Sequence, residues 1–216
     1  MGTGIEQPGV CRKRVYGFVG SYSVGSLKEI SLSAVPGVVW NRRKDTVLGA
    51  NSTQAGPGGV AMTRAQELAA AFVEAIEAVI KTVEALTEEQ WRLKTSAEGW
   101  PAGVVAHHIA ARSGILGLEG IVSGNPSLLH MDLSNIDAWN AREAREFAGC
   151  AKEETLDLLR HISSRVEQLV AGLTDDQLKA RGEVLARGPV TTDQWIVVMM
   201  LTHVRSHHES IIQTVS

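Results

Sequence analysis

The sequence is poor in cysteine, in aromatic residues and in long apolar runs, and these shortages exclude several classes of protein. Two cysteines in 216 residues, Cys11 and Cys150, are too few for a disulfide framework, so a reducing, cytoplasmic setting is expected. No apolar run reaches the roughly 18 residues of a membrane span, and no secretory signal is recognisable. The net charge of −3 gives no general attraction to nucleic acid or to anionic lipid.

Residues 1–61 differ in composition from the rest of the chain. They hold 11 of the 21 glycines and carry seven Lys/Arg against three Asp/Glu, a charge of +4, whereas residues 62–216 carry 14 against 21, a charge of −7. The first part has no helical or strand period and ends in the sequence Asn51-Ser-Thr-Gln-Ala-Gly-Pro-Gly-Gly59, which is typical of a linker or loop. We expect a Gly-rich basic extension over 1–61, either disordered or an over-extended start, and a domain over 62–216.

Apolar residues at spacings of three and four predict four long helices, over 63–86, 102–122, 138–173 and 193–215. The charged run that starts at Lys152 indicates a kink or break in the third. No segment is predicted as a strand. The connection over 123–137 is long for a bundle and permits a crossover between non-adjacent helices. The predicted fold is therefore all-α, a four-helix bundle with a long connection between helices two and three.

Threonines mark the expected starts of several helices, because their hydroxyls accept hydrogen bonds from free backbone N–H groups. Thr63 is the predicted cap of the first helix and Thr192 that of the fourth. The sequences 87–90 and 174–177 both place Gln three residues after Thr, which matches a capping box and predicts two short helical turns.

Histidines carry the chemical signal of the sequence. His203 and His207 stand four residues apart on the predicted last helix, so that both imidazoles lie on one face and can chelate one metal ion. His108 falls in the apolar stripe of the second helix. Burying three imidazoles without partners would be costly, and a shared metal would satisfy all three. A bundle with three core histidines and no metal is the alternative.

The remaining histidines are assigned other places. His107 is expected either at the surface or in contact with a metal-ligating residue. His208 is expected either in packing or in such a contact, and His130 and His161 are expected in solvent. Cys150 is expected to be a small core residue. Three carboxylates are candidates for a fourth ligand: Glu119, Asp137 and Glu143. Val204 follows His203, so the Glu that supplies the base in the His-Glu-x-x-His peptidases is absent.

These motifs resemble the DinB-like family over roughly residues 62–214. The resemblance rests on Trp100-Pro-Ala-Gly-Val-Val-Ala-His107-His108-Ile, on His203-x-x-x-His207-x-x-x-Ile211 and on Asp137-Ala-Trp-Asn140. It implies a four-helix bundle with a divalent metal on His108, His203 and His207, and a homodimer. Zn²⁺, Ni²⁺ and Fe²⁺ all suit such a set.

The resemblance also implies a reaction on a small-molecule substrate. Thiol-dependent members use mycothiol or bacillithiol, so transfer of a low-molecular-weight thiol is the expected activity, and a composition typical of a high-GC bacterium favours mycothiol. One thiol-dependent branch, the isomerases, has Glu at the position of His203, and this chain departs from it. A metal-dependent hydrolase and a non-enzymatic metal-binding or stress-response module remain the alternatives.

Overall fold

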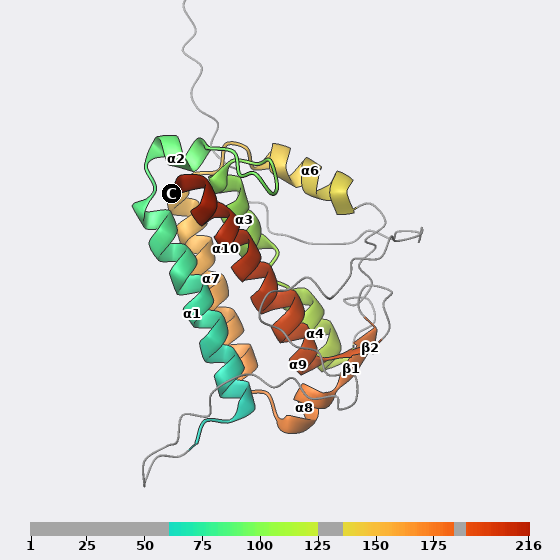
Figure 1. The fold of residues 1–216 in the computed structure, drawn as a ribbon. Helices are drawn as coiled ribbons and strands as arrows, with labels where there is room; N and C mark the ends of the chain where they lie inside the picture. The colour runs from blue at the N-terminus through green and yellow to red at the C-terminus, as the bar shows by residue number, and fades with distance from the viewer. Residues whose placement is uncertain (1–60, 125–135, 184–188) are drawn as a thin grey trace, which may run out of the picture.

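The computed structural model describes residues 61–124, 136–183 and 189–216 (Figure 1). The extension predicted over 1–61 lies almost wholly outside the described residues. So does most of the connection predicted over 123–137, together with His130. Within the described part, no helix is both long and apolar enough to cross a membrane.

The first helix, α1 (Arg64–Ala85), begins and ends within one residue of its predicted bounds. The Thr63 hydroxyl accepts a hydrogen bond from the Gln66 N–H, and the Gln66 side chain accepts one from the Thr63 N–H. The same reciprocal pair, Thr87 with Gln90, opens α2 (Glu88–Arg92). The first pair confirms Thr63 as the predicted cap, and the second confirms the capping box predicted for 87–90.

The second predicted helix is two helices, α3 (Ala102–Ala111) and α4 (Ile115–Ser123), so the single span over 102–122 was wrong. The chain turns at Gly114, whose φ of +81° is a left-handed conformation that residues with a side chain rarely adopt. The apolar period continues across the turn, which is why periodicity alone did not reveal the break.

The third predicted helix is also divided, into α6 (Ile136–Glu146) and α7 (Lys152–Ala171). The break precedes Lys152, where the charged run indicated a kink. The Lys152 ammonium donates to the carbonyls of Glu84 and Leu86 at the end of α1, so it holds the C-terminus of one helix to the start of another.

A short helix and a small hairpin precede the last long helix. After α8 (Asp175–Lys179), β1 (Arg181–Glu183) pairs antiparallel with β2 (Pro189–Thr191), in the register that sets Arg181 against Thr191. The expectation of no strand was therefore wrong. Strands of three residues are too short to show the alternation by which a strand is recognised.

The last long helix is built from three consecutive segments: α9 (Thr192–Gln194), the π-helix η2 (Trp195–Leu201) and α10 (Thr202–Val215). Its cap is Thr191, which forms a capping box with Gln194, and not Thr192 as predicted. Thr192 is buried, and its N–H and hydroxyl both donate to the Ala180 carbonyl next to the hairpin.

These segments form a four-helix bundle of α1, α3 with α4, α7, and η2 with α10 (Figure 1). The most extensive contact between helices joins α1 to α7, while α3 lies against both α7 and α10. Side chains that are completely buried fill the space between the helices, among them Phe72, Ile76, Ile109, Leu159 and Ile196. The pairing of α3 with α10 brings the histidine-bearing segments together.

Candidate metal centre

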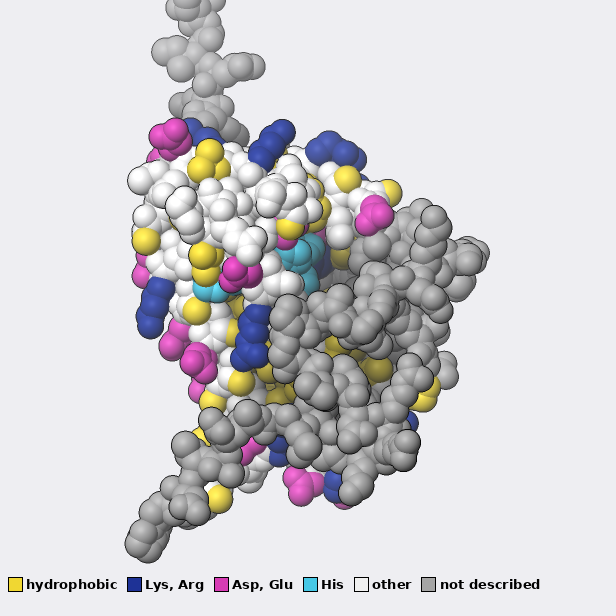
Figure 2. Space-filling view, in the orientation of Figure 1, with side chains coloured by type: hydrophobic (Ala, Val, Ile, Leu, Met, Phe, Trp, Pro, Cys, Tyr) yellow, Lys and Arg dark blue, Asp and Glu magenta, His cyan; other side chains and the backbone are white. Residues whose placement is uncertain are grey.

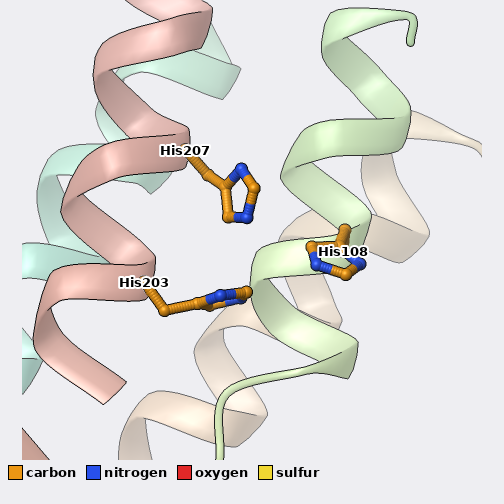
Figure 3. Close-up of side chains that lie close together, drawn as sticks. All are labelled: His108, His203 and His207. Atoms are coloured by element: carbon orange, nitrogen blue, oxygen red, sulfur yellow. The ribbon is translucent and has the colours of Figure 1, made fainter. Parts of the chain in front are cut away.

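His108 on α3 and His203 and His207 on α10 meet inside the bundle (Figure 3). One ring nitrogen from each lies within 4.8 Å of those of the other two. The ring centroids are 5.2 Å apart for His108 and His203, 5.1 Å for His108 and His207, and 4.6 Å for His203 and His207. The three residues singled out from the sequence therefore converge on one point.

Packing fixes the two helices that carry these histidines. Every α3 residue from 102 to 110 is buried, and His108 is only 5% exposed. On α10, Val204 and Ile211 are completely buried and hold the helix with its histidine face toward α3. The edge of the Trp100 ring meets the His108 ring, with centroids 5.4 Å apart, and limits its rotation. The imidazoles are therefore positioned by the core.

The His203 ring has a free, buried nitrogen. Its Nε2 atom is shielded from solvent and has no hydrogen-bond partner among the described residues. Burial, and then the neighbouring His207 and His108, lower the pKa of His203 to about 3. The ring is thus neutral at physiological pH, and a neutral imidazole has one nitrogen with a lone pair that a metal ion can use. A buried polar atom without a partner is explained by a bound ion or an ordered water.

His207 is oriented by a carboxylate that the sequence analysis did not single out. Its Nδ1 atom lies 2.7 Å from Oε1 of Glu98, and the hydroxyl of Ser210 donates to Oε2 of the same carboxylate at 2.5 Å. Burial raises the pKa of Glu98, but hydrogen bonds from His207, Ser210 and Thr95 outweigh that effect and lower it to about 2. Glu98 is therefore ionised, and Nε2 of His207 is left for a ligand.

The turn that carries Glu98 is closed by local hydrogen bonds. Lys94 and Pro101 form an isolated antiparallel bridge, and the Thr95 N–H donates to the Trp100 carbonyl. Gly99 has a φ of +70°, which only glycine adopts without strain. Glu98 lies in a loop with no helical or strand period, so no sequence pattern connected it with a histidine 109 residues away.

His108 is paired with a second carboxylate. Its Nδ1 atom lies 3.5 Å from Oε1 of Glu143, a buried residue of α6, and the Arg112 Nε donates to Oε2 at 2.7 Å. Burial raises the pKa of Glu143, but the contacts with His108 and Arg112 lower it further than burial raises it. The guanidinium of Arg112 stacks on the Trp139 ring at 3.8 Å, which fixes its plane.

A search against protein-family models matches residues 71–211 to the DinB superfamily, which is 141 of the 216 residues. The chain belongs to the DinB superfamily. A solved structure, YfiT from Bacillus subtilis, is described as a probable metal-dependent hydrolase with an unusual four-helix bundle topology. It matches with a TM-score of 0.58 and 17% identity over 74% of this chain and 91% of that one, which supports the shared fold. No curated protein matches.

The three carboxylates considered as a fourth ligand have different surroundings in this DinB-superfamily chain. Glu143 lies against His108, as described above. Glu119 pairs with Arg165 at 2.5 Å, and Asp137 is exposed on α6. Among the described residues, the group of possible ligands contains the three imidazoles and no carboxylate. The acidic groups Glu98 and Glu143 therefore lie next to the histidines and are not themselves in the group of possible ligands.

The other histidines of the DinB-superfamily domain lie apart from this group. His107 was expected at the surface or in contact with a metal-ligating residue. It is 8% exposed and its ring stacks on Phe147 with centroids 3.9 Å apart, so the first of these alternatives was wrong. His208 Nε2 lies 2.8 Å from the Thr82 hydroxyl, which fits the expected packing role. His161 is exposed as expected, whereas Cys150 is only half-buried. Histidine and acidic side chains both reach the face seen in Figure 2.

Proposed function

We propose that this DinB-superfamily protein binds one divalent metal ion through His108, His203 and His207. The observation that carries the proposal is the convergence of three ring nitrogens, one from each histidine, within 4.8 Å of one another. In addition, Nε2 of His203 is buried without a partner among the described residues. Two of the three rings have a carboxylate next to the Nδ1 atom: Glu98 lies next to His207, and Glu143 lies next to His108. In metal sites such carboxylates fix the tautomer of the imidazole and make it a better ligand.

Charge supports the same conclusion. Glu98 and Glu143 are ionised and Arg112 is a cation, so these groups carry a net charge of −1 around the imidazoles. This net negative charge attracts a divalent cation in a region from which water is largely excluded. With the cation bound the same region carries +1, which favours an anionic ligand such as a thiolate. Three imidazoles suit Zn²⁺, Ni²⁺ or Fe²⁺.

The proposed reaction is transfer of a low-molecular-weight thiol such as mycothiol to an electrophilic substrate. A divalent ion at this site would lower the pKa of a thiol or water that it binds. The chain supplies the rest of the machinery: the core fixes the imidazoles, and Glu98 keeps the Nδ1 proton of His207 in place. The Glu143 carboxylate, held by Arg112, lies 3.5 Å from Nδ1 of His108.

Metal-dependent hydrolysis is the second candidate. It is favoured by the likeness in fold to YfiT, which is described as a probable metal-dependent hydrolase. The two reactions differ in the nucleophile, a thiol or water, and need the same set of imidazoles. Hydroxide and thiolate are both anions, so the positive charge of the metal-loaded site would favour either nucleophile.

An activity screen on the full chain tests the proposal. The chain is loaded with Zn²⁺, Ni²⁺ or Fe²⁺ and offered mycothiol, bacillithiol or glutathione with a bimane electrophile, and separately chromogenic esters and amides. Thiol-dependent turnover that is lost in His108→Ala, but kept in the exposed variant His161→Ala, supports the transferase. Turnover of esters or amides without thiol supports the hydrolase. Metal binding with neither activity would overturn the catalytic proposal.

A further inference from the structure

The helix that supplies two of the three histidines changes its winding just before them. η2 runs over Trp195–Leu201 as a π-helix, and α10 follows as an α-helix. At the junction, the N–H and the hydroxyl of Thr202 both donate to the Val197 carbonyl, five residues back. An α-helix would join residues four apart. π-helical turns are rare and frequently occur at functional sites.

The wider winding changes the direction in which later side chains point. An α-helix advances by about 100° per residue, so one extra residue per turn rotates everything downstream by about that angle relative to everything upstream. If η2 rewound as an α-helix, either the residues before it or the histidines after it would leave their present faces. The π-helix thus sets the orientation of α10 relative to Trp195.

Trp195 is held by contacts with two glycines, Gly114 and Gly117, next to the break between α3 and α4. It is 2% exposed, and its indole N–H donates to the Gly114 carbonyl at 2.9 Å. Its ring lies on Gly117 so closely that a Cβ atom there would stand 2.2 Å from Cζ2. The ring therefore has no room to rotate or to slide along α4.

The other end of the helix is fixed as well. His207 is held by Glu98, and Val204 is completely buried against the bundle. Trp195 and His207 are both held in place, so the residues between them must turn by a fixed total angle. The π-helical winding of η2 provides that angle. We propose that Trp195, seated on Gly114 and Gly117, is a positioning residue that holds η2 in its π-helical form and so turns His203 and His207 toward His108.

This inference rests on the proposed metal site, and two variants of the full chain test it. Insertion of one alanine after the half-buried Val198 adds a residue to η2. With Trp195 still packed on Gly117, the added residue would turn the histidines by about 100° away from His108, and we expect affinity for Zn²⁺ to fall at least 100-fold. Gly117→Ala expels the Trp195 ring and should lower affinity at least tenfold. The readout is competition with a chromogenic chelator.

A compensating variant separates positioning from simple loss of stability. Trp195→Phe removes the part of the ring that the added methyl group of Gly117→Ala would displace. The double variant Gly117→Ala/Trp195→Phe should therefore bind Zn²⁺ more tightly than Gly117→Ala alone. Gly103→Ala is the matched control, because a Cβ there would also stand 2.2 Å from a tryptophan, Trp91 of α2. It should be destabilised to a similar degree and keep its Zn²⁺ affinity within about threefold.

A second readout needs no metal. In the metal-free chain, the rate at which diethylpyrocarbonate modifies His203 is measured by peptide mass spectrometry. The insertion after Val198 should raise the rate at least tenfold, because the ring leaves the core. Unchanged affinity and unchanged modification in the insertion variant would overturn the inference, and so would equal losses of affinity in Gly103→Ala and Gly117→Ala. A wild-type chain that binds no metal but shows the expected modification rates would refute only the metal site.

Discussion

Glu98 Oε1 lies 2.7 Å from Nδ1 of His207, although 109 residues separate the two in the sequence. The contact joins a loop without regular structure to the last helix of the bundle, on the side of the imidazole away from His108 and His203. It places an ionised carboxylate where it orients the ring and raises the basicity of the other nitrogen.

Glu98→Gln should weaken metal binding without unfolding the protein. The amide keeps the shape of the side chain but loses the negative charge that supports His207, and loss of such a partner costs about 10–100-fold in affinity. Competition with a chelator measures this. Glu84→Gln, at an exposed carboxylate paired with Arg160, is the control and should bind as the wild type does. Equal affinities in the two variants would contradict the orienting role of Glu98.

Arg112→Ala should destabilise the chain more than the removal of a surface ion pair does. It leaves the Glu143 carboxylate, which is 5% exposed, without its cation, and it removes the stacking on Trp139. We expect a loss of about 2 kcal/mol in the free energy of unfolding, below the range for fully buried pairs because Arg112 is partly exposed. Arg160→Ala, which breaks an exposed pair with Glu84, should cost less than about 1 kcal/mol. Urea denaturation distinguishes these values.

Acid should destabilise the metal-free protein, in part through His107. Burial lowers the pKa of His107 to about 4, whereas the unfolded chain takes up the proton near pH 6.5. The unfolded state therefore binds more protons between these values, so the stabilisation present above pH 6.5 is lost as the pH falls toward 4, by at most about 3 kcal/mol.

The variant His107→Phe isolates that contribution. Phenylalanine retains the stacking on Phe147 and cannot be protonated. Urea denaturation at pH 7 and at pH 4.5, in the presence of a chelator, should show a smaller loss of stability in the variant than in the wild type. His203 contributes to both chains alike. Parallel pH profiles would show that His107 takes up its proton as easily in the folded state as in the unfolded one.

Metal removal should lower the melting temperature. A ligand that binds only the folded state at 100 times its Kd adds about 2.7 kcal/mol, which corresponds to roughly 5–10 °C in a chain of this size. Excess EDTA should reverse the shift, and His203→Ala should show none. A shift of the same size in that variant would mean that the ion binds elsewhere.

Several features of the fold could be predicted because they depend on local patterns. Thr63 and Thr87 cap their helices through hydrogen bonds to residues three positions on, and both caps were predicted and confirmed. The histidine faces follow from helical periodicity, and the structure places His108, His203 and His207 together. Such signals are contained within one or two turns of helix and need no knowledge of the partner segment.

Other features depend on contacts between distant segments. The turn at Gly114 and the π-helix after Gln194 are both stabilised by Trp195, which packs into α4 from the far end of the chain. His107 is buried because Phe147, from the connection after α6, covers it. Neither contact produces a periodic pattern in the sequence, so periodicity predicted continuous helices and left a surface position open for His107.

The most direct test of the metal site is the metal content of the full chain, purified without a histidine tag. Inductively coupled plasma mass spectrometry compares the wild type with the double variant His203→Ala/His207→Ala and with His161→Ala, each after reconstitution and dialysis. We predict about one equivalent of Zn²⁺, Ni²⁺ or Fe²⁺ per chain in the wild type and in His161→Ala, and almost none in the double variant. A folded wild type that holds no metal, or a double variant that holds as much, would contradict the proposed site.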